Sequence, residues 1–263
     1  MIKKSKQSFI KESILVTNGR RLAKSDYLKS LSDAGLDVFS ITIYSSQEDV
    51  HDKITKTKSW YQTSTGIKNA IKLDKKVTLN VVVGPDNYST TIESVKEFVD
   101  WGVDRVIVSC SLPFIGADGF VGDASLSPKK FAELARALTD APSNVFVLFE
   151  LPLCLLEKDV IKKLSEDMRL DYGCHIGVGS GIVVDVNGNV LPCNSFANFP
   201  LFNIFEFDAI NKNRDEFYQF WNQNKEVVNF RAEANVLRSP ICQKCSLWQI
   251  CNCGCPLLWG YYN

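Results

Sequence analysis

Several residue types and motifs are scarce or missing in this chain of 263 residues, and each absence narrows its possible functions. With only two histidines, His51 and His175, no Ser-His-Asp triad can be argued. No run of about eighteen apolar residues exists, which argues against a transmembrane helix, and the basic N-terminal stretch lacks the apolar core of a signal peptide. Thirty basic residues balance thirty acidic ones, so the charge does not point to nucleic acid. We expect a cytoplasmic protein with neither a membrane nor a nucleic-acid partner.

Two nucleotide-binding motifs are also absent. The sequence contains neither GxGxxG nor GxxxxGK followed by Ser or Thr, so neither a Rossmann dinucleotide loop nor a P-loop is indicated. No internal repeat of about 20 to 50 residues is visible. A hydrophobic content of 45% and a charged content of 23% are ordinary for a globular protein, so a folded domain or two is expected.

The first 150 residues alternate between apolar strand-like segments and amphipathic helical segments. This alternation predicts a parallel sheet with right-handed crossovers, in either a barrel or an open doubly wound arrangement. One helix begins clearly, with Ser127 as N-cap and Pro128 in the first turn, and another is expected to be capped by Ser25. Strands are predicted at 13–19, 36–45, 76–85, 103–111 and 143–151, and the other two helices at 64–73 and 90–102.

Small polar residues occupy the predicted carboxyl ends of these strands. Ligands of parallel α/β sheets bind at that edge, so these residues are candidates for a ligand site. They are Thr17 and Asn18, Ser45 and Ser46, Pro85 to Asn87, and Ser109 to Ser111. His51 follows one of these strands and is expected at a helix start or on the surface.

The character of the sequence changes after about residue 155. A helical link is followed by alternating residues at 181–193 around Asn187–Gly188, a strong β-hairpin signal. A helix is predicted at 205–223, and its aromatic residues are expected to form core. We therefore predict two domains, residues 1–155 and 156–263.

Nine cysteines are the most informative residues. Cys110 and Cys154 lie in apolar runs and are expected to be buried, inert thiols. Without a signal peptide, metal ligation is a better interpretation of the others than disulfide bonding. These candidate metal ligands are Cys174, Cys193, Cys242, Cys245, Cys251, Cys253 and Cys255.

Spacing alone leaves three states of these cysteines open. The CxxC at 242–245 is typical of half a zinc site, whereas a [4Fe-4S] cluster takes four thiolates from more scattered positions. The chain has one CxxC, a CxCxC after it, and one cysteine at each end of the hairpin region. Seven thiolates fit one complete cluster and a second, incomplete one, so iron–sulfur is favoured over zinc and over free thiols.

The cysteine pattern resembles that of a known family. Cys174, Gly188 and Cys193 are similar to the C-x9–15-G-x4-C opening of the SPASM domain, and the block from Cys242 to Cys255 reads C-x2-C-x5-C-x3-C, as in its second part. SPASM domains follow radical S-adenosylmethionine (SAM) enzymes and hold auxiliary [4Fe-4S] clusters. The segments ILVTNG, DVFSITIYS and VTLNVVV resemble the third, fourth and fifth strands of those enzymes. The resemblance implies an α/β fold: an incomplete parallel (β/α) partial barrel, then a small cysteine-rich domain.

The resemblance also implies how the ligands are divided. Cys174, Cys193 and Cys255 would hold an inner auxiliary cluster, and Cys242, Cys245 and Cys251 an outer one. The last cysteine of the SPASM pattern is absent, so the outer cluster lacks a ligand. Cys253 either substitutes for it or is a bystander. A cluster with three cysteines would leave one iron open to substrate or solvent.

By the same resemblance, Asn18, Thr42 and Asn80 would line a SAM pocket. Each also has an ordinary alternative role, as a turn former, a strand former and a satisfied buried amide. The C-x3-C-x2-C triplet that binds the catalytic cluster of radical SAM enzymes is absent, and so is the Gly-Gly-Glu segment. No catalytic residue is therefore predicted.

Three explanations fit these absences: a fragment of a longer enzyme, a degenerate homologue, or a chain completed by another subunit. An incomplete barrel would expose a sheet edge, which predicts poor solubility or oligomerisation. The complete enzyme would modify a peptide or protein and draw electrons from a reductant such as ferredoxin or flavodoxin. The alternative is a non-catalytic binding or electron-transfer module that carries a cluster or zinc.

Overall fold

The computed structural model shows two compact units, which are described separately. Unit 1 contains Met1–Ser111, Leu126–Leu148 and Leu156–Asp171, and unit 2 contains Leu112–Ser125, Phe149–Leu155 and Tyr172–Asn263. The structure describes residues 1–6, 10–112, 114–116, 119–121, 126–174, 181–205, 214–236, 239–251 and 253–258. Among the helices in these ranges, none has the length and apolar character needed to cross a bilayer.

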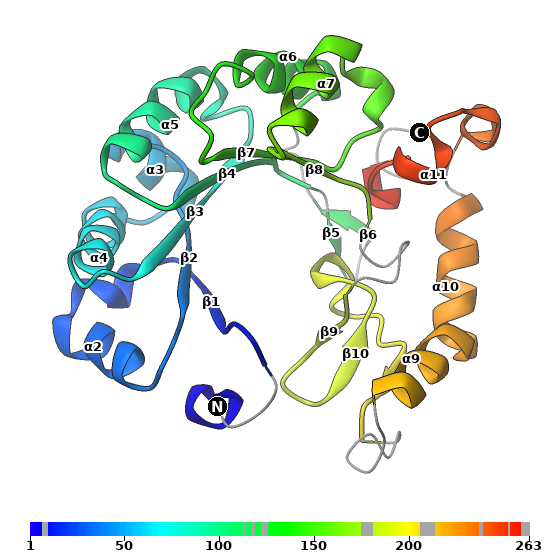
Figure 1. Cartoon of the computed structure of the whole chain (residues 1–263), viewed down its shortest axis with the longest axis horizontal. Coiled ribbons are helices and arrows are strands. Elements are labelled where there is room, and N and C mark those ends of the chain that lie inside the picture. Colours follow the sequence, from blue (N-terminus) through cyan, green and yellow to red (C-terminus); the bar gives the residue numbers. More distant parts are fainter. Residues whose placement is uncertain are drawn as a thin grey trace. The chain divides into compact units, whose positions relative to one another are not determined.

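Unit 1 is built on a six-stranded sheet with the order β1-β2-β3-β4-β7-β8 (Figure 1). Neighbouring strands from β1 to β7 pair in parallel, which confirms the parallel sheet expected from the alternating sequence. The strands are β1 (Ile14–Thr17), β2 (Val38–Thr42), β3 (Lys76–Val83), β4 (Arg105–Cys110), β7 (Val145–Phe149) and β8 (Leu170–Tyr172).

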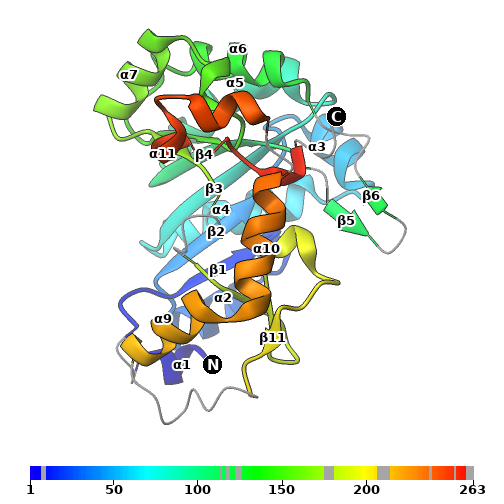
Figure 2. The same cartoon turned by 90° about the vertical axis from the view of Figure 1, so that its right-hand side faces the viewer.

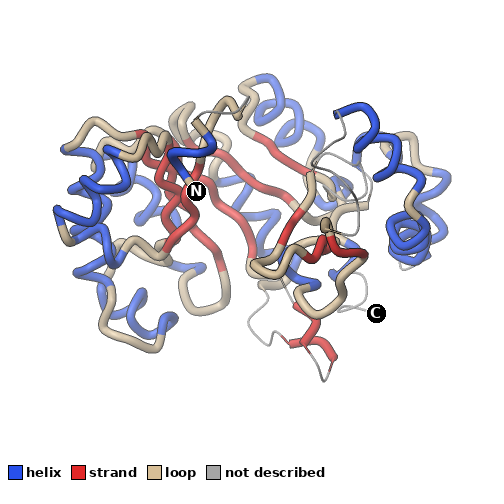
Figure 3. Tube along the Cα trace, turned by 90° about the horizontal axis from the view of Figure 1, so that it is seen from below, coloured by secondary structure: helices blue, strands red, loops and turns tan. Residues whose placement is uncertain are grey.

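Apart from the short N-terminal helix at Ile2–Ser5, the helices of unit 1 lie on the outer side of this curved sheet, and in Figure 3 helices flank strands that run side by side. Along β3, Val77, Leu79, Val81 and Val83 are fully buried, while the alternate side chains stay partly exposed. Coverage of one face indicates a partial barrel and not a doubly wound sheet. The helices are α1 (Ile2–Ser5), α2 (Ser25–Asp33), α3 (Glu48–Thr55), α4 (Trp60–Lys72), α5 (Thr91–Asp100), α6 (Pro128–Ala137) and α7 (Lys158–Glu166), with 3-10 turns at Arg20–Ala23 and Tyr88–Thr90.

Two helix starts differ in how well the sequence predicted them. Ser127 is the N-cap of α6, and its hydroxyl accepts a hydrogen bond from the Lys130 amide at 3.4 Å, as expected. Ser25 was expected to be an N-cap, but it is the first residue of α2, and Lys24 precedes it without a side-chain cap. The Ser25 prediction was wrong by one residue because a cap is identified from sequence only to within a residue or two.

The first strand lies at the edge of the sheet. Within the described residues β1 pairs with β2 alone, and its Ile14 and Val16 are 55% and 71% exposed. An exposed apolar edge strand can pair with another chain. The sheet therefore has the edge that the sequence led us to expect.

Unit 2 contains the predicted hairpin. Strands β9 (Val183–Val184) and β10 (Asn189–Leu191) pair antiparallel, and β11 (Phe202–Asn203) joins the other side of β10. Gly188 has φ 83°, and a Cβ there would lie 2.5 Å from Cε2 of Phe205. Asp185 closes the turn, because its Oδ1 accepts hydrogen bonds from the amides of Asn187 (2.8 Å) and Asn189 (2.9 Å).

Two consecutive helices, α9 (Arg214–Gln223) and α10 (Lys225–Val236), contribute the small core of unit 2 (Figure 2). Val190, Trp221 and Val227 form its buried centre, and Cys174 packs against it. Of the aromatic residues expected in the core, Trp221 is buried, whereas Tyr218 is 46% exposed. The remaining elements are β5 (Phe114–Gly116), β6 (Gly119–Val121), α11 (Trp248–Cys251) and 3-10 turns at Leu153–Leu155, Asn194–Phe196 and Pro240–Lys244.

Candidate metal centres and a polar cavity

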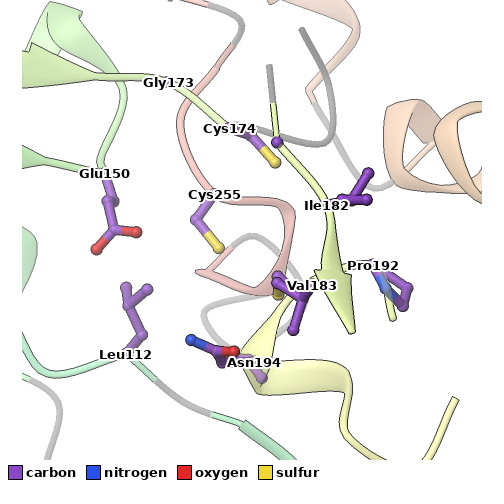
Figure 4. Close-up of a pocket in the computed structure, with 12 residues that line it drawn as sticks. Leu112, Glu150, Gly173, Cys174, Ile182, Val183, Pro192, Asn194 and Cys255 are labelled. Atoms are coloured by element: carbon purple, nitrogen blue, oxygen red, sulfur yellow. The ribbon is translucent and has the colours of Figure 1, made fainter. Parts of the chain in front are cut away.

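Three cysteines from distant parts of the chain line one cavity in unit 2. Cys174 follows β8, Cys193 follows β10, and Cys255 follows α11. The cavity has a volume of about 470 Å³ and is also lined by Glu150. In Figure 4 the side chains of Cys174, Cys255 and Glu150 reach it from three different segments. We call this the inner site; its remaining lining residues are Leu112, Gly173, Gly181, Ile182, Val183, Pro192, Asn194 and Ser195.

Burial controls the acidity of two inner-site thiols, Cys193 and Cys255. It is the main cause that raises the pKa of Cys193 above its ordinary value. It also raises the pKa of Cys255 to about 12, with a smaller contribution from the nearby negative charge of Glu150. These thiols stay protonated unless a positive charge arrives, and bound metal deprotonates a coordinating thiol outright. The inner site therefore suits metal-binding thiols better than nucleophilic ones.

A second group of cysteines lines a smaller, largely apolar cavity of unit 2, which we call the outer site. Cys242 and Cys245 lie in and just after a 3-10 turn, and Cys251 ends α11. The turn is closed by the Cys245 amide, which donates to the carbonyl of Cys242 at 3.0 Å. The complete lining is Pro152, Cys154, Cys242, Cys245, Leu247, Trp248, Cys251 and Cys253. The cavity measures about 30 Å³, so a cluster would have to push the cysteine side chains apart.

The two cysteines that were expected to be inert differ in the structure. Cys110 is 5% exposed on β4, as expected. Cys154 is exposed and lines the outer site, so its prediction as a buried thiol was wrong. The apolar neighbours Leu153 and Leu156 are buried while the cysteine between them points outward, because the 3-10 turn rotates successive side chains to different sides.

The donor chemistry of both sites fits iron–sulfur clusters. Each site offers at least three thiols among apolar side chains, and iron–sulfur clusters are held by cysteine thiolates from scattered positions. Within the described ranges, no three His, Cys, Asp or Glu side chains are grouped as ligands of a single metal ion. Trp248 also lines the outer site.

A polar cavity of about 460 Å³ lies in unit 1, at the carboxyl ends of β1 and β2. Two of the three residues predicted for a SAM pocket, Asn18 and Thr42, line it. Asn80 does not line it: it pairs with Thr42 across β2 and β3, and its amide donates to the Ser40 hydroxyl at 2.7 Å. The other lining residues, which the sequence did not single out together, are Arg20, Tyr44, His51, Thr55, Thr57, Ser59 and Thr63.

His51 is the fourth residue of α3, close to the expected helix start, but it is 2% exposed and is therefore not a surface residue. Its Nδ1 accepts a hydrogen bond from the Tyr44 amide at 3.3 Å, and its Nε2 lies 3.2 Å from the Ser59 hydroxyl. Burial lowers the pKa of His51, partly offset by Asp52. A neutral imidazole thus fixes the wall of the polar cavity.

Other polar residues at the strand ends serve the fold. Ser45 and Ser46 are buried against Ser94, with hydroxyl oxygens 3.1 Å and 3.3 Å from it. Asn87 is fully buried; its Oδ1 accepts from the Gly84 amide at 2.8 Å, and its Nδ2 donates to the Tyr44 carbonyl at 2.7 Å. The hydrogen-bonding groups of these three residues close loops, so they are not candidates for a ligand site.

Two family models match the chain. The model described as the radical SAM superfamily matches residues 1–99, and the SPASM model, described as an iron-sulfur cluster-binding domain, matches residues 174–246. Iron–sulfur clusters and SAM, the cofactors expected from the resemblance, are those of these two families. A comparison with curated proteins gives no match.

Solved structures share the fold at low sequence identity. A structure of anSMEcpe with bound AdoMet and a peptide is 16% identical, with a TM-score of 0.61, over 93% of this chain and 66% of that one. Streptococcus suis SuiB bound to S-adenosylmethionine is 18% identical, with a TM-score of 0.63, over 93% of this chain and 55% of that one. The chain thus spans 55% to 66% of the length of these proteins. The two family models thus identify a radical SAM match and a SPASM match in the chain, and the solved structures show the same fold.

Proposed function

We propose that unit 2 binds two auxiliary [4Fe-4S] clusters, and that the chain is part of a radical SAM enzyme that modifies a peptide or protein. The observation that carries this proposal is the separation of the cysteines into two groups. Cys174, Cys193 and Cys255 line the inner site, and the cysteines from 242 to 253 line the outer site. This grouping supports the proposed division, in which Cys242, Cys245 and Cys251 serve the outer cluster and Cys174, Cys193 and Cys255 the inner one.

In the inner site, three thiolates would hold the cluster and leave one iron without a cysteine. Auxiliary clusters of this kind exchange single electrons, and an open iron can bind a substrate group. The apolar side chains of Leu112, Ile182 and Val183 would keep water from the sulfurs, and such exclusion tunes a cluster's potential. The volume of about 470 Å³ leaves space beside the thiols for part of a substrate.

In unit 1, the polar cavity would bind SAM. Asn18 and Thr42 line it and would donate hydrogen bonds to the ribose or to the carboxylate of the methionine moiety. Asn80 would act from the adjacent strand, where its amide already donates to Ser40. SAM binding measured by calorimetry should weaken in Asn18→Ala and Thr42→Val, and stay unchanged in the control Thr139→Val, whose hydroxyl bonds only its own helix end.

The peptide substrate is proposed from the solved structures. anSMEcpe is described with a bound peptide and AdoMet, and SuiB with the precursor peptide SuiA. A reductant such as ferredoxin or flavodoxin would supply electrons. If the catalytic-cluster cysteines come from a separate subunit, that subunit would be a further partner. We place the protein in the cytoplasm because thiolate ligands require a reducing compartment.

The alternative function is a module that carries clusters or zinc and binds or transfers electrons without cleaving SAM. It would need only the cysteines of unit 2, which line the inner and outer sites. Because these 263 residues contain no CxxxCxxC, we expect this chain alone to produce no 5′-deoxyadenosine from SAM under reducing conditions. SAM binding in the polar cavity distinguishes the two functions, because only the radical SAM enzyme requires SAM.

The division into two cluster sites is tested by metal analysis of paired variants. Cys193→Ser with Cys255→Ser, and separately Cys242→Ser with Cys245→Ser, should each lower the iron content from about eight to about four atoms per chain. Cys110→Ser, a buried cysteine on β4, serves as the control and should not change it. If one pair removed all the iron, or if neither removed any, the division would be wrong.

A further inference from the structure

Three of the cysteines that line the outer site, Cys242, Cys245 and Cys251, match the family pattern. A cubane takes four thiolates when it is fully coordinated. Two further cysteines line the same cavity, Cys154 and Cys253, so the structure itself offers two candidates.

The segment that carries Cys154 is attached directly to the outer site. The Leu153 amide donates a hydrogen bond to the sulfur of Cys251 at 3.2 Å, although the two residues are 98 positions apart. Pro152 lines the same cavity beside Cys154. An amide that binds a ligand sulfur adjusts cluster potential, and here it also fixes the neighbouring residue next to the site.

A second contact holds this segment in place. The Cys255 amide donates to the Glu150 carbonyl at 2.6 Å, and Gly254 approaches so closely that a Cβ would lie 2.4 Å from that oxygen. Residues 150–154 are therefore tied to the 251–255 segment at both ends. These two contacts determine where Cys154 lies.

Cys154 suits ligation better than Cys253. Cys154 lies in a short 3-10 turn and is exposed, so its side chain can turn toward a cluster. Cys253 is 3% exposed and has φ 59°, a left-handed conformation that limits how its side chain can be redirected. Cys253 lies two residues from Cys251, which lines the outer site, and two residues from Cys255, which lines the inner site.

From these contacts we propose that Cys154 is the fourth thiolate ligand of the outer cluster. The proposal rests on the proposed function, because it requires a metal centre at the outer site. It assigns the fourth ligand of the outer cluster to the 150–154 segment, whose Cys154 lines the same cavity as Cys242, Cys245 and Cys251.

The test is cysteine alkylation in the folded chain, mapped by mass spectrometry. Cys154 should react with iodoacetamide in the metal-free chain and become protected when the chain is reconstituted anaerobically with iron and sulfide. In Cys242→Ser with Cys251→Ser, which lacks the outer site, Cys154 should stay reactive under the same conditions. Equal reactivity of Cys154 with and without the outer cluster would overturn the proposal.

Substitution gives a second readout. In a background without the inner site (Cys193→Ser with Cys255→Ser), Cys154→Ser should change the electron paramagnetic resonance spectrum of the outer cluster and make it lose iron on mild oxidation. Cys253→Ser should do neither, and the reverse pattern would overturn the proposal. Stoichiometric zinc without sulfide would refute the proposed function alone, since Cys154 protected by zinc would still be the fourth ligand. A chain that bound neither metal would refute both.

Discussion

The backbone amide of Cys255 donates a hydrogen bond of 2.6 Å to the backbone carbonyl of Glu150. Cys255 belongs to the inner site, and Glu150 opens the segment that reaches the outer site at Cys154. The single contact therefore fixes a ligand of one site and the approach to the other. Gly254 makes it possible, because with φ 71° it brings the chain against the Glu150 carbonyl.

Gly254→Ala should disturb both sites. An added Cβ would meet the Glu150 carbonyl at 2.4 Å, and the left-handed backbone alone costs about 1–3 kcal/mol for a side-chain residue. Gly102→Ala is the matched control, since Gly102 has φ 83° but nothing within 4 Å of the added Cβ. We expect urea unfolding to show a larger loss of stability, and iron analysis a loss of cluster, in Gly254→Ala only. Equal effects would mean that strain, and not the close approach, governs this position.

The acidity of Cys255 should respond to Glu150. In the metal-free chain its pKa is raised to about 12, first by burial and then by the negative charge of Glu150. Glu150→Gln removes that charge, so the pKa should fall while burial keeps it above the ordinary value. Alkylation of Cys255, followed by mass spectrometry between pH 8 and 11, should therefore be faster in the variant at every pH. An unchanged rate would show that Glu150 does not act on the thiol.

His51 should make unit 1 sensitive to acid. Its pKa is lowered in the folded chain by burial, so below the ordinary value of about 6.5 the unfolded chain takes up a proton that the folded one does not. Stability that is present above that pH should be lost as the pH falls. Denaturant unfolding of the metal-free chain at pH 7 and pH 5 should show a smaller loss in His51→Gln than in the wild type. Identical pH dependence in the two chains would contradict the role assigned to the buried imidazole.

The exposed edge of β1 should promote self-association. Ile14 and Val16 present an apolar strand with one neighbour in the described part of the sheet. Replacing both by lysine should shift the chain toward monomer, because a charged edge resists pairing with a second strand. Light scattering after size exclusion measures this, with Leu73→Lys as a control that is 45% exposed at the end of α4. A wild type that is already a stable monomer would refute the prediction.

Local signals explain what the sequence predicted correctly. The hairpin turn requires a residue with left-handed backbone, and Gly188 supplies it. The Asn187–Gly188 signal was therefore enough to predict the hairpin. The strongly apolar strands β2, β3 and β4 alternate with helices, which specifies a parallel sheet without further information. The grouping of Cys174 with Cys193 and Cys255 came from a family pattern and not from local physics.

Long-range packing explains what the sequence could not predict. The run LPLCLL is apolar, so it suggests a buried Cys154. The contact that decides its environment joins the Leu153 amide to the Cys251 sulfur, two residues that are 98 positions apart. His51 is buried by Tyr44 and Ser59, whose approach depends on how α3 lies against the sheet. The side-chain amide of Asn80 donates a hydrogen bond to Ser40 on the adjacent strand, and only the register of β2 and β3 brings these two residues together.

The binding of two iron–sulfur clusters by unit 2 can be measured directly. Iron, acid-labile sulfide and zinc should be determined per chain after anaerobic reconstitution and desalting. Two clusters would give about eight iron atoms with matching sulfide and little zinc. About four would mean that a single site is loaded. Stoichiometric zinc without sulfide would contradict the account and make the C-terminal cysteines a zinc-binding module.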